Sequence, residues 1–179
     1  MSQKNQKQLE EILLIFSAAD AKSIPLWLES GWAVDARLGS TTRDHEDIDI
    51  AYAAVFRIEF ETMLRTLGYI MTEKNDDRFL MSKGEILIDA EPGIQDDKGY
   101  HPEGFPEGCL PKNREGRLQN ATIHCISWEG MFWEFLFYTK EVPLQNWRTK
   151  DIETLEIITK HLNRRTIISL QKRFKKEQG

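Results

Sequence analysis

Hydrophobic residues in the N-terminal half recur with the spacing of amphipathic helices in two places. Leu9, Ile12 and Phe16 repeat at helical intervals, which predicts a helix over residues 5–18. The same spacing predicts a helix over residues 56–67, and Gly68 follows as its stop signal. A shorter helix is predicted over residues 32–38, between Ser30-Gly31 and Gly39.

Apolar or alternating segments between these helices predict strands. Successive side chains of a strand point to opposite faces, so short alternating or wholly apolar runs bounded by turn residues are typical of strands. Such runs cover residues 24–28, 48–55, 69–73, 78–82 and 85–91. Lys83-Gly84 predicts a tight turn between the last two. We therefore expect a mixed sheet with flanking helices, which is an α+β arrangement.

The pattern changes after residue 91. Residues 92–120 contain five of the eleven glycines and four of the six prolines, which predicts a long loop or an irregular hairpin. A strand is predicted over 122–126, and Ser127 is a suitable N-cap for a helix over 128–140. Two more helices are predicted over 149–162 and 164–176. The expected domains are residues 1–120, a catalytic α/β domain, and residues 121–179, a helical substrate-binding domain.

Composition restricts the classes of function. The net charge is −5 without a basic stripe ahead of the C-terminal tail, which disfavours nucleic-acid binding. The apolar runs are too short to cross a membrane, and the N-terminus lacks the features of a signal peptide, so we expect a cytoplasmic protein. Cys109 and Cys125 have no spacing typical of disulfide frameworks or structural zinc.

Asp47-Ile48-Asp49 is the strongest local signal for chemistry. Residues two apart in a strand share a face, so both carboxylates project together while Ile48 faces the core. Asp89 lies in another apolar strand, and three carboxylates converge if the two strands are neighbours. Adjacent carboxylates repel unless a cation neutralises them, and Mg²⁺ takes one or two carboxylates plus substrate phosphates. The layout is that of two-metal phosphoryl transfer.

An Asp-x-Asp motif alone is also typical of a solvated strand end, so neighbouring residues matter. Ser30-Gly31 at a helix start could present main-chain N–H groups to phosphates. Thr42, Arg43 and His45 directly precede the acids, where they could bind a triphosphate. These features together favour a nucleotide site.

Two segments of the chain resemble those of a known family. They are Ser30-Gly31-Trp32-Ala33-Val34-Asp35-Ala36-Arg37-Leu38-Gly39 and Thr42-Arg43-Asp44-His45-Glu46-Asp47-Ile48-Asp49. They resemble the aminoglycoside and lincosamide nucleotidyltransferases of the polymerase-β-like superfamily, and the aminoglycoside 2''-O-nucleotidyltransferases most of all. Similarity continues through 88–92, 127–143 and 147–153, and covers nearly the whole chain. It implies a polymerase-β-like nucleotidyltransferase core with a C-terminal helical domain.

The resemblance also implies roles for individual residues. Asp47 and Asp49 would bind Mg²⁺, and Asp89 would act as general base and share a metal. The ATP triphosphate would be held by Ser30, Gly31, Arg43 and His45. Two departures from the family stand out. Ser30 replaces the first of two glycines, and the stretch 75–78 differs, which would alter drug preference if it borders the acceptor pocket.

The acceptor side is predicted from acidic residues of the first C-terminal helix and its end. Glu129, Glu134 and Glu141 recur there, and an idle charge between Trp133 and Phe135 would be costly, so Glu134 either faces substrate or forms a structural ion pair. We take Glu134, Tyr138 and Glu141 as predicted aminoglycoside contacts. Trp27, Trp32 and Trp133 have apolar neighbours and are predicted to lie in the core.

The expected activity is transfer of AMP from Mg²⁺-ATP to an aminoglycoside hydroxyl, the 2'' position by resemblance, with release of pyrophosphate and two metal ions taking part. The expected partners are small molecules only, and the expected state is a monomer or weak dimer. A lincosamide nucleotidyltransferase is the near alternative, and it would need fewer acids in the second half. A non-catalytic nucleotide-binding or toxin–antitoxin partner is the distant one, although such a protein should have lost one of the three acids, and this chain retains all three.

Overall fold

The computed structural model describes residues 2–178. Its helices are α1 (Gln3–Ala21), α2 (Ser30–Leu38), α3 (Arg57–Thr66), α4 (Trp128–Glu141), α5 (Thr149–Lys160) and α6 (Arg164–Gln178), with 3₁₀ turns η1 (Ala54–Phe56) and η2 (Leu144–Asn146). Its strands are β1 (Leu26–Leu28), β2 (Ile48–Ala53), β3 (Ile70–Lys74), β4 (Phe79–Lys83), β5 (Ile86–Gln95), β6 (Gly99–Pro102), β7 (Leu110–Pro111), β8 (Gly116–Leu118) and β9 (Ala121–Ile123).

One mixed sheet forms the centre of the molecule. Its strand order is β1-β2-β5-β4-β3, and β6 continues from β5 to pair with β7. The pairing of β2 with β5 is parallel, whereas the other named pairs of this sheet are antiparallel. A parallel pair requires a crossover, and α3 with the β3–β4 hairpin provides it. Strands β8 and β9 form a separate hairpin.

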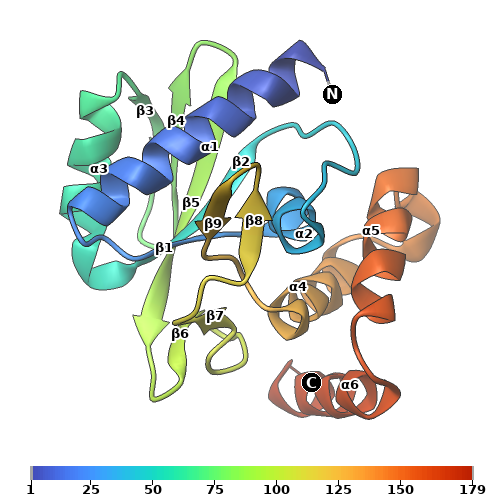
Figure 1. The fold of residues 1–179 in the computed structure, drawn as a ribbon. Coiled ribbons are helices and arrows are strands. Elements are labelled where there is room, and N and C mark those ends of the chain that lie inside the picture. The colour runs from blue at the N-terminus through green and yellow to red at the C-terminus, as the bar shows by residue number, and fades with distance from the viewer. Residues whose placement is uncertain (1, 179) are drawn as a thin grey trace.

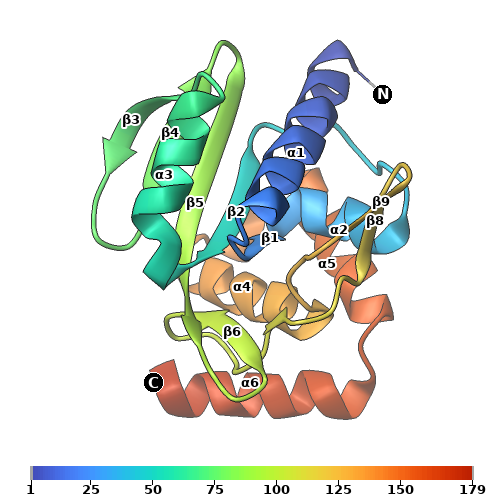
Figure 2. The same ribbon diagram turned by 60° about the vertical axis from the view of Figure 1, so that its left-hand side comes forward.

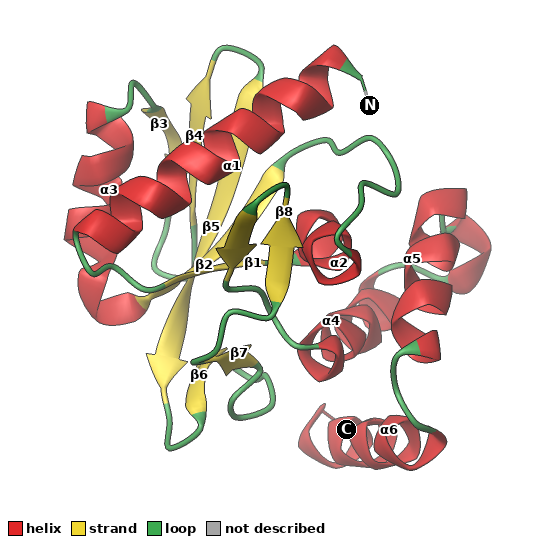
Figure 3. Ribbon diagram, in the orientation of Figure 1, coloured by secondary structure: helices red, strands yellow, loops and turns green. Residues whose placement is uncertain are grey.

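Helices lie on both sides of this sheet. In Figure 1, α1 and α3 lie in front of the strands, while α4, α5 and α6 gather beyond α2 on the other side. The rotated view shows α6 at the bottom of the molecule, far from the N-terminus (Figure 2). Figure 3 shows the resulting division into a strand-rich part and a helical part.

Aromatic side chains fill the interface between α3 and the central sheet. Phe60 of α3 lies 5.4 Å from Tyr52 of β2 and 5.8 Å from Phe79 of β4, measured between ring centroids. All three residues have no exposed surface. The buried side chains of α3, which recur with helical spacing, thus pack against side chains of β2 and β4 that share one face of the sheet because they recur at every second residue.

The C-terminal helices share the same hydrophobic core. Trp133 of α4 is fully buried, packs edge-on against Phe174 of α6 at 5.1 Å and donates its indole N–H to the Gly104 carbonyl. Trp27 and Trp32 are also buried, so the predicted core positions of all three tryptophans are confirmed. Cys109 and Cys125 are free and buried within this core.

Most predicted elements are present, with shifts at their ends. Helix α2 begins at Ser30, not at residue 32, and β2 ends at Ala53, because η1 follows before α3. Residues 92–120 form more than a loop. They hold the end of β5 and strands β6, β7 and β8, so the irregular-hairpin alternative was the better one. Gly99 permits this pairing, since a Cβ there would lie 2.6 Å from the Leu110 carbonyl oxygen.

The strand predicted over 122–126 is shorter than expected. Strand β9 ends at Ile123, and Cys125 forms only an isolated parallel bridge with Leu28. The division into domains of residues 1–120 and 121–179 stays a prediction; its boundary falls in the turn between β8 and β9. No helix in the described part of the chain is long and apolar enough to cross a membrane.

The aromatic cluster predicts how much α3 contributes to stability. Phe60→Ala should lower the free energy of unfolding by about 3–5 kcal/mol, because it leaves a cavity between Tyr52 and Phe79. Ile58→Ala on the same helix is a matched control, since Ile58 is 76% exposed, and should change it by no more than about 0.5 kcal/mol. Urea denaturation measures both. Equal losses in the two variants would contradict this packing.

Candidate active site

Two predicted carboxylates meet on the central parallel strand pair. The register sets Asp49 of β2 directly beside Asp89 of β5. Neighbouring strands are about 4.8 Å apart, and paired residues present their side chains to the same face. Asp47 lies directly ahead of β2, and its charge is one of the influences that raise the pKa of Asp49. The parallel pairing of β2 with β5 that the predicted convergence requires is present, and the use of the three acids as a metal site stays a prediction.

Three further acids surround this pair. Glu91 lies two residues beyond Asp89 on β5, and Glu29 follows β1, where its main-chain N–H donates to the Asp49 carbonyl at 3.0 Å. Glu134 approaches from α4. These residues line a cavity of about 160 Å³ with Asp49, Asp89, Ser30, Arg78 and Phe105.

The electrostatics of this cluster favour protonation. Burial, followed by the charges of Asp47 and Glu134, raises the pKa of Asp49 well above its usual range. Burial and the neighbouring Glu91 do the same to the pKa of Glu29. For Glu134, burial raises the pKa to about 7, although its hydrogen bond from Ser30 opposes the shift. Burial and like charge therefore make the ionised forms of these carboxyls costly, and a bound cation would lower that cost.

Ser30 joins the start of α2 to α4. Its φ angle is 49°, a left-handed conformation that favours glycine and costs a non-glycine residue about 1–3 kcal/mol. The side chain offsets part of that cost, because its Oγ donates to Glu134 Oε1 at 2.5 Å. The departure from glycine at this turn thus adds a contact to an acid of the cleft.

Gly31 allows the following loop to approach α2 closely. A Cβ at this position would lie 2.5 Å from Arg43 Nη2 and 2.6 Å from His45 Nδ1. A side chain here would therefore displace both residues. Ser30, Gly31, Arg43 and His45, all predicted phosphate ligands, line one cleft together with Asp47 and Asp49.

Buried hydrogen bonds hold the loop at residues 40–46. Asp35 of α2 accepts from Thr42 N at 2.9 Å, from Thr42 Oγ1 at 2.6 Å and from His45 Nε2 at 2.6 Å. The imidazole also stacks on Trp32, with 4.4 Å between centroids. Asn5 of α1 accepts from His45 N at 2.9 Å and donates to the Arg43 carbonyl at 2.8 Å. His45 is therefore fixed in orientation from both sides.

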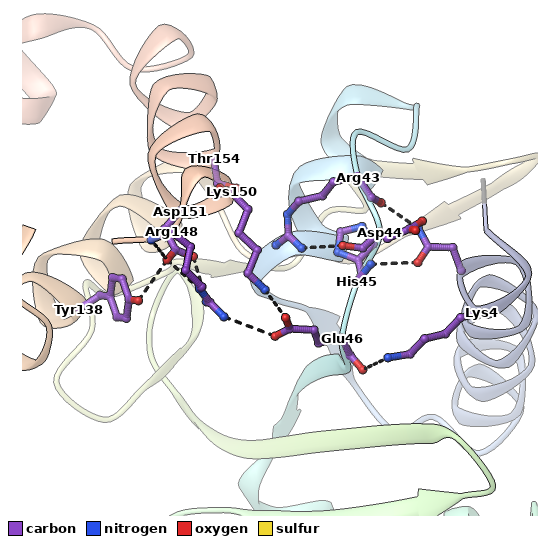
Figure 4. A network of polar contacts seen from close by, with 11 residues as sticks. Lys4, Arg43, Asp44, His45, Glu46, Tyr138, Arg148, Lys150, Asp151 and Thr154 are labelled. Carbon is purple, nitrogen blue, oxygen red and sulfur yellow. Dashed lines mark hydrogen bonds and ion pairs between the residues drawn. The ribbon is translucent and has the colours of Figure 1, made fainter. Parts of the chain in front are cut away.

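The main cleft has a volume of about 380 Å³ and lies between this loop and helices α4 and α5. Basic residues enter it from two places, Arg43 from the loop and Arg148 with Lys150 from the start of α5 (Figure 4). Glu46 stands between Arg148 and Lys150. The cleft thus contains cations as well as the acids of β2 and α4.

The predicted acceptor residues also face this cleft. Glu134, Tyr138 and Glu141 all line it, whereas Glu129 does not. Tyr138 donates its hydroxyl to Asp151 Oδ2 at 3.1 Å, and Glu141 is exposed at the end of α4. Glu134 accepts a hydrogen bond from the Ser30 hydroxyl, a neutral group, which favours a substrate-facing acid over a structural ion pair.

The stretch 75–78 reaches the cluster through Arg78. Its Nη1 lies 3.1 Å from Asp89 Oδ2, and it lines the smaller cavity. Arg78 lowers the pKa of Asp89, but burial, the larger influence, leaves that pKa raised. Arg57 supports this turn by donating to the main-chain oxygens of Asn75 and Asp76.

The donor set suits a divalent cation that arrives with its substrate. Within residues 2–178, no group of three or more His, Cys, Asp or Glu side chains is arranged so that it could hold a metal ion by itself. Mg²⁺ rarely needs such a group, because it keeps several waters and takes one or two carboxylates plus phosphate oxygens. Asp47 and Asp49 offer oxygen ligands on one face, beside a cleft large enough for a nucleotide.

Four residues of the site were missed by sequence reasoning. Glu91 could have been found, because it shares the strand face of Asp89, and Glu29 directly follows a buried strand. Arg148 and Lys150 gave a weaker signal. They are cations at the start of α5, where the helix dipole disfavours positive charge.

A family model described as aminoglycoside-2''-adenylyltransferase matches residues 11–155. A 2''-aminoglycoside nucleotidyltransferase of Klebsiella pneumoniae is 38% identical over 168 residues, which cover 94% of this chain and 95% of the relative.

Solved structures agree with this likeness. The crystal structure of ANT(2'')-Ia in complex with adenylyl-2''-tobramycin superposes with a TM-score of 0.92 at 35% identity, covering 97% of this chain and 99% of that one. A lincomycin-bound lincosamide adenylyltransferase, LnuA, reaches a TM-score of 0.65 at 22% identity, covering 84% of this chain and 95% of that one. The second likeness shows the fold alone.

The raised pKa of Glu134 predicts a pH-dependent stability. A carboxyl whose folded pKa lies above its ordinary value of 4.5 contributes stability below that pH and loses it as the pH rises through about 7. Glu134→Gln keeps an acceptor for Ser30 but has no charge. In the absence of divalent cations, the free energy of unfolding of Glu134→Gln should rise by about 1–3 kcal/mol relative to that of the wild type when the pH is raised from 5 to 8.

Urea denaturation at the two pH values measures this gain. Glu141→Gln on the same helix is the control, because Glu141 is exposed. A gain for Glu134→Gln no larger than that of the control would show that Glu134 is ionised at little cost.

Proposed function

The chain belongs to the aminoglycoside-2''-adenylyltransferase family, and on that premise we propose that it transfers AMP from ATP to the 2''-hydroxyl of an aminoglycoside. The bond between the acceptor oxygen and the α-phosphorus forms, the bond from that phosphorus to the pyrophosphate oxygen breaks, and pyrophosphate leaves. The observation that carries the proposal is the pairing of Asp49 with Asp89 at a nucleotide-sized cleft of mixed charge.

Asp47 and Asp49 are the proposed ligands of Mg²⁺, with two ions in the working site. When bound, the metal supplies positive charge next to the α-phosphate and lowers the cost of the charge that develops there. The two aspartates supply oxygen ligands from one strand face. The raised pKa of Asp49 is compatible with this role, because burial first and the neighbouring negative charges second make the ionised form costly until a cation is bound.

Asp89 is the proposed general base, which also contributes to the metal site. It would accept the proton of the attacking hydroxyl as the oxygen approaches the α-phosphorus. Arg78 holds this carboxylate at 3.1 Å and so limits its rotation. The small cavity beside Asp89 gives the acceptor hydroxyl a route to it.

Ser30, Gly31, Arg43 and His45 are the proposed triphosphate ligands. The first turn of α2 presents main-chain N–H groups that have no partner within the helix, and such groups bind phosphate oxygens. Arg43 adds a permanent positive charge next to Gly31. Asp35 and Trp32 hold the imidazole of His45. His45 would therefore fix the loop and present its Nδ1 atom to the phosphates.

Glu134, Tyr138 and Glu141 are the proposed aminoglycoside contacts. Each ammonium group that leaves water needs an anionic or carbonyl partner, since an unpaired buried charge is costly. Glu134 would give up its proton to form such a pair, and Tyr138 would offer its ring and its hydroxyl beside Asp151. Glu141 lies at the rim of the cleft.

The remaining proposals concern the setting. We expect a cytoplasmic monomer or weak dimer whose partners are small molecules and not nucleic acid, since the net charge of −5 opposes phosphate-backbone binding. A lincosamide acceptor has one amine and would use fewer of the acids that line the cleft.

Substitution of a metal ligand tests the reaction. With Mg²⁺-ATP and a panel of aminoglycosides and lincomycin, the wild type should add AMP to aminoglycosides, read by mass spectrometry. Asp49→Asn should reduce turnover by about 10³-fold or more, because it removes charge from the metal site. Asp44→Asn, an exposed carboxylate on the same segment, is the control and should retain turnover. Transfer to lincomycin alone would overturn the acceptor assignment, and full activity of Asp49→Asn the metal site.

The base assignment has its own test. Asp89→Asn is nearly isosteric and should lower kcat by about 10²–10⁴-fold, the usual contribution of general-base catalysis, with little change in KM for the drug. Glu85→Gln, exposed just ahead of the same strand, should leave both parameters unchanged. A rise in KM alone would identify Asp89 as a binding residue.

A further inference from the structure

We propose that Lys150 and Arg148 form the binding site for the β- and γ-phosphates of the nucleotide, and that Glu46 occupies this site as an internal carboxylate until the nucleotide displaces it. The inference rests on the proposed function and extends it. It names two cations that the preceding assignment leaves without a role and gives the apo enzyme a defined resting state.

Glu46 bridges the two cations with its two carboxylate oxygens. Lys150 Nζ lies 2.8 Å from Oε1, and Arg148 Nη1 lies 3.5 Å from Oε2 (Figure 4). Lys150 also lowers the pKa of Glu46 through a hydrogen bond and its charge. Two oxygens of one carboxylate therefore lie between these cations, and two oxygens of one phosphate group can make the same contacts.

This cation pair faces the nucleotide cleft. Arg148, Lys150 and Glu46 all line it with Asp47 and Asp49, and Glu46 is the residue directly before Asp47. A nucleotide whose α-phosphate lies at the aspartates can extend its remaining phosphates along the same cleft. Arg148 and Lys150, at the start of α5, line that cleft beside Glu46.

Arg148 is held by Asp151, whereas the Lys150 ammonium forms an ion pair with Glu46. The Arg148 guanidinium donates Nε and Nη2 to the two oxygens of Asp151, each at 3.0 Å, and Tyr138 donates to the same carboxylate. Only Nη1 is directed at Glu46. Lys150 has a flexible stem, and its contact with Glu46 is the one most readily exchanged for a phosphate.

The main chain at Glu46 is anchored independently of its side chain. Lys4 of α1 donates to the Glu46 carbonyl at 2.7 Å, and Asn5 accepts from the adjacent His45 N. The carboxylate can therefore leave the cations without moving the loop that carries Asp47. Displacement by nucleotide is then a change of side-chain rotamer.

The difference in charge between one carboxylate and a triphosphate favours replacement of Glu46 by the nucleotide. The Glu46 side chain is 66% exposed, and exposed ion pairs contribute little because water and salt screen them. A triphosphate tail carries several negative charges and binds more strongly to the same cations. Glu46 is thus a weak competitor that neutralises the site in the empty enzyme and yields to the nucleotide.

The first test measures ATP binding by calorimetry in the presence of Mg²⁺ and without any drug. Lys150→Met should weaken binding by about 10- to 100-fold, as expected for loss of a charge-assisted contact. Lys160→Met is the matched control on the same helix, because Lys160 is exposed at its far end, and should change affinity less than twofold. Equal affinities of the two variants would overturn the proposal.

The second test separates competition from a purely structural contact. Glu46→Gln should bind ATP about two- to fivefold more tightly than the wild type, because it removes the competing charge. In the Lys150→Met background the same substitution should give a smaller gain. Glu153→Gln, exposed on α5, is the control. A lower melting temperature for Glu46→Gln with unchanged or weaker ATP binding would identify the bridge as a tie between loop and helix only.

These measurements are independent of the transfer reaction. If the wild type modifies no aminoglycoside but still binds ATP through Lys150, the acceptor assignment fails and the cation site stands. If AMP transfer is observed while Lys150→Met binds ATP normally, the function stands and this inference fails.

Discussion

The in-register parallel pairing of β2 with β5 is the constraint on which the rest of the site depends. It sets Asp49 beside Asp89 and brings Glu91 to the same face. Carboxylates gathered in this way repel one another and are partly shielded from water, so their surroundings must compensate. The raised pKa values of Glu29 and Glu134 favour their neutral forms, and the Arg78 guanidinium and the Ser30 hydroxyl contact Asp89 and Glu134. A bound cation or an ammonium group of the drug would take over this compensation.

Side chains of both signs line the main cleft. Acids come from β2 and α4, permanent cations come from the loop before β2 and from the start of α5, and Glu46 pairs with Lys150 between them. An enzyme that joins a polyanionic donor to a polycationic acceptor needs groups of both signs in one cleft. In the proposed assignment, the C-terminal helices contribute to both halves of substrate recognition.

Local patterns predicted the elements well, and chain-distant contacts account for what they missed. The helical and strand periods located α1, α3 and β2, and the two-residue spacing of Asp47 and Asp49 pointed to the proposed site. Residues 92–120 form their strands by pairing β6 with β5 and β7, which composition cannot predict. Likewise, the partnership of Glu46 with Lys150 joins residues about a hundred positions apart, and nothing in either segment alone indicates it.

The two cysteines have a practical consequence. Cys109 and Cys125 are both buried, and burial raises the pKa of Cys109 and raises that of Cys125 to about 11. A thiol reacts as its thiolate, so both should be inert to maleimides and to mild oxidants at neutral pH. The natural chain can therefore serve directly as a background for single-cysteine labelling. Probes introduced on α5 and on the 40–46 loop would report the width of the cleft in solution.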